Sequence, residues 1–294
     1  MPESPSRTHG VVDDVVFSLD REPGHALFLL IALSLAPVLM DRFLEKREPL
    51  LMVSDPPYDI ELDSEWRDRA GINKHGPAEP SYMKRRIEGH TRTAISGDTI
   101  ADWSHAFELV PSLQVAYVWN ASRFTCEVLQ GLLRIGFVHY QQIIWRKTAA
   151  ALTRTHYWYA HENCWYVRKK NAPWYGKPGE NTTVWDAASP KMIMGGSDEV
   201  KYDHPAQKPV ALMTRPILNH LRKGELVFDP FLGSGTILAA AEITDRVCFG
   251  LELDPKYVDV IVQRWQQLTG KQATLEADDR SFDAVQAGCV GGEA

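Results

Sequence analysis

The sequence has little cysteine, with four residues in a chain of 294. None of them stands in the C-x-x-C spacing of a zinc knuckle, and scattered thiols do not make the disulfide framework of a small secreted protein. The stretch HENCW also lacks the second histidine of an H-E-x-x-H zinc site. We therefore predict no metal site, reduced thiols and a cytoplasmic protein. The cysteines are Cys126, Cys164, Cys248 and Cys289.

The sequence also lacks a hydrophobic run long enough for a comfortable membrane span. Its most apolar segment, residues 26–40, is shorter than the roughly 20 residues of a spanning helix, and Pro37 interrupts it. Acidic residues outnumber basic ones just upstream, whereas a signal peptide has a basic flank. We predict a buried strand here, then a helix near residues 37–46, and no membrane partner.

An excess of basic residues is missing as well. The 32 lysines and arginines are outnumbered by 38 aspartates and glutamates, which gives a formal net charge of -6. The chain as a whole is therefore not a polycation that coats nucleic acid, and any such contact must be local. A hydrophobic share of 44% and a charged share of 24% are ordinary for a globular protein with a sizeable core.

What the sequence does contain is an alternation of strand-like and helix-like segments. Apolar runs rich in β-branched and aromatic residues predict strands, and apolar residues at helical spacing predict helices between them. Such a series predicts an α/β fold with a doubly wound, mostly parallel sheet, whose ligands lie at the carboxyl ends of the strands. The strands are predicted at residues 115–120, 139–147, 225–230 and 247–254, and the helices at 126–136, 235–244 and 255–269.

One strand-like segment ends in unusual chemistry, in the stretch LLMVSDPPYD at residues 50–59. Proline fixes φ and pushes the preceding residue into extended geometry, so Asp55, Pro56 and Pro57 form a stiff arm whose carboxylate and carbonyls point outward as acceptors. The Asp55 carboxylate and the Pro56 carbonyl suit the two N–H donors of an exocyclic amino group, and Tyr58 can stack on the ring that bears it. The bland alternative is a Pro-Pro turn with Asp55 as a helix cap.

A second strand-like segment runs into FDPFLGSGT at residues 228–236. Glycines there let the backbone approach a ligand closely, and the start of the next helix offers free N–H groups. Glu252 follows Gly235 by seventeen residues, where an acid would bind ribose hydroxyls. The pattern is not G-x-G-x-x-G, so it favours an adenosine-bearing ligand without phosphates over a dinucleotide. Taken alone, such a turn is also typical of strand-to-helix connections without a ligand.

Together the two segments resemble the amino-methyltransferases of DNA, which use S-adenosylmethionine to methylate N6 of adenine or N4 of cytosine. The order, with DPPY first and DPFLGSGT far downstream, is similar to the beta class of that family. The stretch HPAQKP at residues 204–209 is similar to the family's run before a helix that lines the cofactor pocket. The resemblance covers residues 24–283 and implies a Rossmann-like methyltransferase domain there, between a leader at 1–23 and a tail at 284–294.

The resemblance also implies a role for each matching residue. The residues implied to hold and stack the target base are Asp55, Pro56, Pro57 and Tyr58. Because the methyl sulfonium is already activated, the transfer is a direct displacement that needs positioning and no metal. The residues implied to surround the cofactor are Asp229, Pro230, Phe231, Gly233, Ser234, Gly235, Thr236, Glu252, Lys208 and Pro209.

A duplex substrate would have to release its target base from the stack, which requires a basic and aromatic surface near the pocket. Residues 141–180 carry seven basic residues against two acids, and eight aromatics, of which Trp165 and Tyr166 are expected in the core. The family places target recognition in this part of the chain, and we predict that region at residues 148–203. A second basic run follows DPPY, where a solvated loop is an equal alternative. The residues predicted to contact DNA are Lys84, Arg85, Arg86, Arg154, Lys169, Lys170 and Lys177.

Several functional alternatives stay open. Asp at the first position of DPPY favours adenine, because Ser is usual in cytosine-N4 enzymes, but both targets are similar amines. Relatives usually carry a Gly-Asp pair where this chain has residues 30–34, so an inactive DNA-binding relative is a further alternative. A nicotinamide oxidoreductase would want G-x-G-x-x-G and has no use for DPPY. The resemblance implies a bacterial or phage protein that acts on double-stranded DNA, in restriction-modification or as an orphan enzyme, and leaves a homodimer and a cognate nuclease open.

Overall fold

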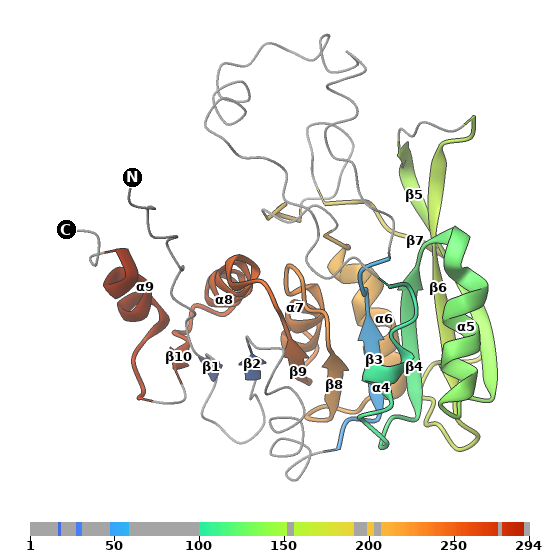
Figure 1. Cartoon of the computed structure of the whole chain (residues 1–294), viewed down its shortest axis with the longest axis horizontal. Coiled ribbons are helices and arrows are strands. Elements are labelled where there is room, and N and C mark those ends of the chain that lie inside the picture. Colours follow the sequence, from blue (N-terminus) through green and yellow to red (C-terminus); the bar gives the residue numbers. More distant parts are fainter. Residues whose placement is uncertain are drawn as a thin grey trace, which may run out of the picture.

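The computed structural model describes residues 17–18, 28–30, 48–58, 100–151, 156–190, 199–202, 207–275 and 278–290. In this part of the chain, a ten-stranded sheet forms the middle layer and helices cover both of its faces (Figure 1). The strand order is β10-β1-β2-β9-β8-β3-β4-β6-β5-β7. The α/β architecture predicted from the alternating pattern is confirmed.

The centre of the sheet consists of parallel strands and includes both unusual strand ends. These strands are β2 (Phe28–Leu30), β9 (Val247–Leu251), β8 (Leu226–Asp229), β3 (Leu51–Ser54) and β4 (Val115–Asn120). Every residue of β3 and β4 is buried. Burial on both faces explains why these strands read as continuous apolar runs and not as an alternation of apolar and polar residues.

The sheet continues beyond β4 with an antiparallel hairpin. β6 (Tyr159–Arg168) pairs antiparallel with both β4 and β5 (His139–Ala151), so it separates two strands that the sequence pattern predicted in succession. β7 (Val184–Asp186) then pairs parallel with β5 at the edge. The region predicted as an inserted recognition segment, residues 148–203, thus contributes β6 and β7 to the sheet.

At the other edge, segments predicted outside the domain belong to the fold. β1 (Phe17–Ser18) lies in the predicted leader and pairs antiparallel with β2 and with β10 (Thr274–Leu275). The helix α9 (Phe282–Val290) extends into the predicted tail. Neither element has the strong periodic pattern that made the central strands predictable, because each is short.

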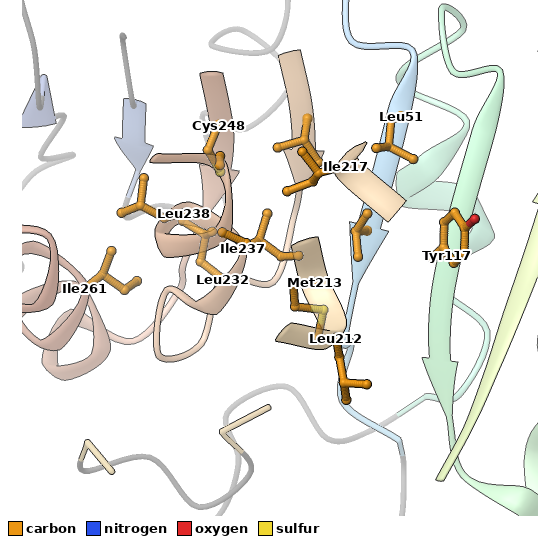
Figure 2. Packing of buried hydrophobic residues seen from close by; sticks show 14 of the residues in the cluster. Leu51, Tyr117, Leu212, Met213, Ile217, Leu232, Ile237, Leu238, Cys248 and Ile261 are labelled. Carbon is orange, nitrogen blue, oxygen red and sulfur yellow. The ribbon is translucent and has the colours of Figure 1, made fainter. Parts of the chain in front are cut away.

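Each face of the sheet has its own hydrophobic core. Leu51 and Val53 of β3 face one core and Met52 faces the other, as the period of two along a strand requires. The helices α6 (Val210–His220), α7 (Thr236–Glu242) and α8 (Pro255–Thr269) cover the first face. Figure 2 shows Leu212, Ile237 and Ile261 from these helices among the packed side chains of this core. The helices α4 (Ser104–Phe107) and α5 (Thr125–Arg134) cover the second face.

The helix α8 shows how local sequence sets the boundaries of an element. Asp254 caps its start by accepting a hydrogen bond from the Lys256 N–H at 3.0 Å, and Pro255 occupies the first turn. The helix ends at Gly270, whose φ of 70° is the left-handed conformation that glycine adopts without a Cβ penalty. These signals explain why its predicted range and its observed range agree.

Some predictions fall outside the described residues. The helix predicted at residues 37–46 lies there, as do residues 31–34 of the segment that replaces the usual Gly-Asp pair. Within the described ranges, no helix has both the length and the hydropathy of a membrane span.

Candidate active site

The two unusual strand ends lie next to each other, because β3 and β8 are adjacent parallel strands. Ser54, the last residue of β3, donates its hydroxyl to Asp229 Oδ1 at 2.8 Å. The two residues are separated by 175 positions in the sequence. A single buried hydrogen bond therefore joins the DPPY segment to the glycine-rich segment.

Trp103 makes a second connection between the two segments, and the sequence analysis did not single it out. Its indole Nε1 donates to the Pro57 carbonyl at 3.1 Å. Its ring meets the Phe231 ring edge-on, with the centroids 4.8 Å apart. The prediction that the carbonyls of the DPPY arm point outward as acceptors is therefore wrong for Pro57, because a half-buried indole N–H has taken that carbonyl as its partner.

The Asp55 carboxylate has a partner on each of its oxygens. Oδ1 accepts a hydrogen bond from the Tyr58 hydroxyl, and Oδ2 accepts one from Lys208 Nζ at 2.5 Å. The sequence predicted an outward-pointing carboxylate beside a free aromatic platform. The structure differs because an acid in this environment is stabilised by a nearby cation and by hydrogen-bond donors.

Lys208 has a second carboxylate partner, Glu162 of β6. Its Nζ lies 3.0 Å from Glu162 Oε2, and Glu162 Oε1 lies 2.5 Å from Lys147 Nζ of β5. Only 5% of the Lys208 side chain is exposed. We call Asp55, Lys208, Glu162 and Lys147 the Asp55 cluster, in which two carboxylates alternate with two ammonium groups.

The net pKa shifts of the two acids in the Asp55 cluster have opposite directions. Burial raises the pKa of Asp55 more than the neighbouring Lys208 lowers it, and the charge of Glu162 raises it further. Burial would also raise the pKa of Glu162, but Lys208 and Lys147 outweigh burial and bring that pKa down to about 2. Glu162 is therefore ionised over the whole neutral pH range, whereas the ionised form of Asp55 depends on the nearby Lys208 ammonium.

The glycine-rich segment forms a tight loop between β8 and α7. Gly233 and Gly235 have φ values of 53° and 71°, the left-handed region that disfavours other residues. Asp229 Oδ1 accepts from the Phe231 N–H at 3.0 Å, and Glu252 Oε2 accepts from the Gly233 N–H at 2.7 Å. The loop thus gathers the predicted ribose-binding acid and the predicted acid of the DPF sequence at one strand edge.

Asp229 and Glu252 have no cationic partner among the described residues. Burial is the largest cause of a raised pKa in each case, to about 7 for Asp229 and about 7 for Glu252, against backbone donors that lower it. Among the described residues, no lysine or arginine forms an ion pair with either of them. A ligand with positive charge, such as the sulfonium and amino group of S-adenosylmethionine, would stabilise the ionised form of these buried carboxylates. The residues therefore fit that cofactor.

The hydroxyls of the glycine-rich segment turn toward a buried arginine. Arg264 of α8 donates through Nη1 to the Ser234 carbonyl at 2.8 Å and to Thr236 Oγ1 at 3.2 Å. Its Nη2 pairs with Glu199 at 3.0 Å, and Glu199 also accepts from the Val210 N–H that begins α6. This network, which the sequence did not predict, connects the glycine-rich loop to α8 and to the start of α6.

Lys208 and Pro209 border the same loop through their backbone. Thr236 Oγ1 donates to the Lys208 carbonyl at 3.2 Å, and Pro209 is the residue that precedes α6. The main chain of Lys208 thus lies beside the glycine-rich segment, as predicted from the sequence. Its ammonium group, on the other hand, reaches the Asp55 cluster.

The basic residues of the 141–180 window do not form one surface, and that prediction is wrong. Asn163 of β6 pairs with Asn120 at the carboxyl end of β4, whereas Arg168 pairs with Val115 at its beginning. Lys169 and Lys170 follow Arg168, and Lys169 Nζ binds the Pro111 carbonyl. An antiparallel strand carries its two ends to opposite edges, so these two lysines lie far from Asp55.

Lys177 belongs with the lysines at that opposite edge. The Tyr175 N–H donates to the carbonyl of Asn219, which lies near the end of α6. Asp55 lies near the start of the same helix, because its partner Lys208 comes just before α6. Lys177 itself forms an exposed ion pair with Glu180. The other residues predicted to contact DNA, Lys84, Arg85, Arg86 and Arg154, lie outside the described residues.

Basic and aromatic side chains do remain on the side of the Asp55 cluster. Arg146 and Lys147 of β5 line a hollow of about 410 Å³ together with Asp186 of β7. Beyond it, Tyr157 and Trp158 are 90% and 57% exposed. The upper part of the β5–β6 hairpin rises past the end of β4 in Figure 1. The expectation that Trp165 and Tyr166 are core residues is confirmed.

No group of metal-ligating side chains was found within the described part of the chain. His161 belongs to β6, next to Glu162, and the latter is engaged with two lysines. Cys164 is buried without a metal-ligating cluster around it.

Comparison with known proteins reveals a relationship over most of the chain. Residues 50–263 match the family model described as DNA methylase. The type II methyltransferase M2.DpnII of Streptococcus pneumoniae is 25% identical over 236 residues, which cover 76% of this chain and 85% of that protein. The DNA adenine methyltransferase YhdJ of Escherichia coli strain K12 is 36% identical over 97 residues, which cover 33% of this chain and 32% of YhdJ.

A solved structure shares the fold. The PvuII DNA methyltransferase, described as cytosine-N4-specific, superposes with a TM-score of 0.54 and 16% identity, over 83% of this chain and 90% of that one. Several curated relatives are matched over only 25% to 46% of their own length.

Proposed function

The chain belongs to the DNA methylase family of N6 and N4 amino-methyltransferases, and we propose that it transfers a methyl group from S-adenosylmethionine to N6 of adenine in double-stranded DNA. S-adenosylmethionine is the methyl donor of this family. The observation that carries the proposal is the Ser54–Asp229 hydrogen bond of 2.8 Å. It fixes an acceptor for an amino group and a loop suited to a cationic cofactor at one edge of the sheet.

The DPPY residues have the base-binding role in this proposal. The Asp55 carboxylate accepts a hydrogen bond from the target amino group, and the prolines hold the backbone of the arm stiff. Tyr58 donates to Asp55 and offers its ring to the base. These contacts orient the nitrogen lone pair, and in a direct displacement such positioning supplies most of the rate enhancement.

The glycine-rich loop has the cofactor-binding role. Asp229 and Glu252 would hold the positive and the ribose parts of S-adenosylmethionine, while Phe231 and the backbone around Gly233 and Gly235 would enclose it. When bound, the cofactor supplies an activated methyl group, which joins the amino nitrogen as the carbon–sulfur bond breaks, leaving a neutral thioether and one released proton. Pro230, Ser234, Thr236, Lys208 and Pro209 complete the proposed pocket.

The DNA-binding role passes to residues near the Asp55 cluster. Arg146, which is exposed and paired with Asp186, stands next to Lys147 of the Asp55 cluster on β5 and would meet DNA phosphates. The exposed Tyr157 and Trp158 would offer apolar surface to an opened duplex. Enzymes that modify a base must take it out of the stack, because the amino group is inaccessible inside the duplex.

Adenine is favoured over cytosine by two observations. Asp55 stands at the first position of the box, and YhdJ, an adenine methyltransferase, is 36% identical over the matched 97 residues. The second candidate is cytosine-N4 methylation, because the PvuII enzyme carries that activity on the same fold. A cytoplasmic location and a role in restriction-modification belong to the same proposal.

The test is to incubate the protein with S-adenosylmethionine and DNA from a methylation-free host, digest the DNA to nucleosides and identify them by mass spectrometry. We expect N6-methyladenine from the wild type and none from Asp55→Ala. The Glu180→Ala variant, which removes an exposed acid at the opposite edge, is the matched control and should stay active. N4-methylcytosine would establish the alternative, and neither product together with no cofactor binding would support an inactive relative.

A further inference from the structure

Lys208 is held by more groups than a lysine that only borders a cofactor pocket requires. Its Nζ contacts Asp55 Oδ2 at 2.5 Å, Glu162 Oε2 at 3.0 Å and the Tyr58 hydroxyl at 3.2 Å. The rings of Tyr58 and Trp119 are also close, with centroids 5.6 and 5.5 Å from Nζ. An ammonium in this position is stabilised by anions and ring faces and not by bulk water.

This arrangement conflicts with the role of Asp55 in the proposed reaction. The target amino group must donate to the Asp55 carboxylate, and one of the two carboxylate oxygens is already occupied by an ammonium that can only donate. An incoming amino group would compete with the Lys208 ammonium for the lone pairs of this carboxylate, so base binding would weaken the Lys208–Asp55 contact. Without a second carboxylate partner, the nearly buried ammonium would then be strongly destabilised.

Glu162 removes this conflict because it gives the ammonium a second carboxylate. We propose that Glu162 is a positioning residue, which keeps the Lys208 ammonium in place when the amino group of the target base takes over the Asp55 carboxylate. Lys147 holds Glu162 in turn from the other side, at 2.5 Å. This inference rests on the proposed methyltransferase function and adds to it a residue on β6, outside all the matched motifs.

The charged and titratable groups around Asp55 come from four parts of the fold. Tyr58 lies on the same loop, Lys208 precedes α6, Glu162 and Cys164 lie on β6, and Asp229 ends β8. Among them, Lys208 lowers the pKa of Asp55 and Glu162 raises it. Removal of each partner should therefore move the acid limb of the activity profile in a different direction.

The first test compares Glu162→Gln, Lys208→Met and the double variant. Turnover is measured with tritiated S-adenosylmethionine and saturating DNA from a methylation-free host. Glu162→Gln should lower kcat by about tenfold to a hundredfold, because the ammonium then competes for Asp55. Cofactor affinity should change by less than about threefold, because no contact to the glycine-rich loop is removed. In the Lys208→Met background the same change should alter kcat by less than about twofold.

The pH profile supplies a readout that a merely structural role would not move. The acid limb of kcat should shift to lower pH in Glu162→Gln and to higher pH in Lys208→Met. Glu180→Gln removes a carboxylate from an exposed ion pair at the opposite edge and should leave the limb in place. Equal effects of Glu162→Gln in both backgrounds, or limbs that shift in the same direction, would overturn the inference.

Two further outcomes keep this inference separate from the proposed function. If the wild type methylates DNA and Glu162→Gln is equally active, only the inference fails. If the wild type methylates no DNA, the proposed function fails and takes the inference with it. If Glu162→Gln alone does not fold, as judged by cofactor binding and thermal unfolding, the comparison of Lys208→Met with the double variant decides. A tenfold lower kcat of the double variant would refute the role of Glu162, and equal values would support it.

Discussion

The two Asp-Pro strand ends differ in how their carboxylates are balanced. Asp55 has a lysine at 2.5 Å and a tyrosine hydroxyl. Asp229, one strand away, has neutral donors alone among the described residues, the Ser54 hydroxyl and the Phe231 N–H. A buried acid that already has its cation is suited to a neutral donor, whereas a buried acid without one is suited to a cationic ligand.

This difference agrees with the two ligands of the proposed reaction. The amino group of a base is neutral and meets Asp55, and the cofactor carries positive charge and meets Asp229 and Glu252. If the comparison holds, changes at the two strand ends should affect different steps, with chemistry lost at one end and cofactor affinity at the other.

The largest effect is expected from Asp55→Asn. The amide keeps the shape of the side chain but loses the negative charge that orders the target amino group, so turnover should fall by about 10³-fold or more. Cofactor affinity, measured by isothermal titration calorimetry, should change by less than about threefold. A parallel loss of cofactor binding would show that the two strand ends do not have separate roles.

The next largest effect is expected from Asp229→Asn. The amide oxygen can still accept from Ser54 and Phe231, but it no longer attracts a cation, so the Kd for S-adenosylmethionine should rise by about tenfold to a hundredfold. The control is Asp245→Asn, in an exposed ion pair with Lys223 at the other end of the β8–β9 connection. Unchanged affinity in Asp229→Asn would contradict the assignment of the glycine-rich loop to the cofactor.

Cofactor binding should also depend on pH. The pKa of Asp229 is raised to about 7 in the free protein, and a cationic ligand requires its ionised form, so binding at lower pH must release a proton. The affinity should rise by about tenfold between pH 6 and pH 8 for one such group. Calorimetry in two buffers of different ionisation enthalpy measures the released proton. A flat affinity across this range would mean that neither Asp229 nor Glu252 meets positive charge.

The same pKa values have a consequence for the stability of the free protein. Because the folded pKa lies above the unfolded value of 3.8 for Asp229, this group contributes stability at low pH that is lost as the pH rises toward 7. Bound cofactor should reverse that loss. The increase in Tm caused by saturating S-adenosylmethionine is therefore expected to be larger at pH 8 than at pH 6.

The smallest effect is expected from Ser54→Ala, which breaks the bond between the two strand ends. A buried carboxylate loses one donor, so the free energy of unfolding should fall by about 1 to 3 kcal/mol at pH 8 and by less at pH 6, where Asp229 is protonated. Urea denaturation at the two pH values measures this. The pH midpoint of cofactor binding should shift upward, and an unchanged midpoint would show that Ser54 does not influence Asp229.

The candidate site was predictable where its chemistry is local. Residues 50–58 combine an apolar strand with Asp-Pro-Pro, and residues 226–236 combine another with a glycine-rich turn, so each segment indicates its own geometry. Trp103, Glu162 and Arg264 carry no such local signal. They became visible only through partners that lie between 15 and 128 positions away in the sequence.

The basic window shows the opposite case, in which nearness in sequence misled the prediction. Lys147 and Lys169 lie in one short stretch of the chain, but Lys147 is on β5 and Lys169 directly follows β6, so the two lie near opposite ends of this antiparallel hairpin. A count of charges along the sequence cannot detect this reversal, because it depends on where the hairpin turns and on what β6 pairs with.

The sequence alone determined the α/β class and the two strand ends, because backbone restrictions of proline and glycine and the burial of apolar runs are local properties. The tertiary structure decided how the charges are paired. Lys208 reaches Asp55 across 153 positions, and Glu162 reaches Lys208 from β6. Coulomb energy depends on distance in space and on burial, and both are set only when the strands have assembled.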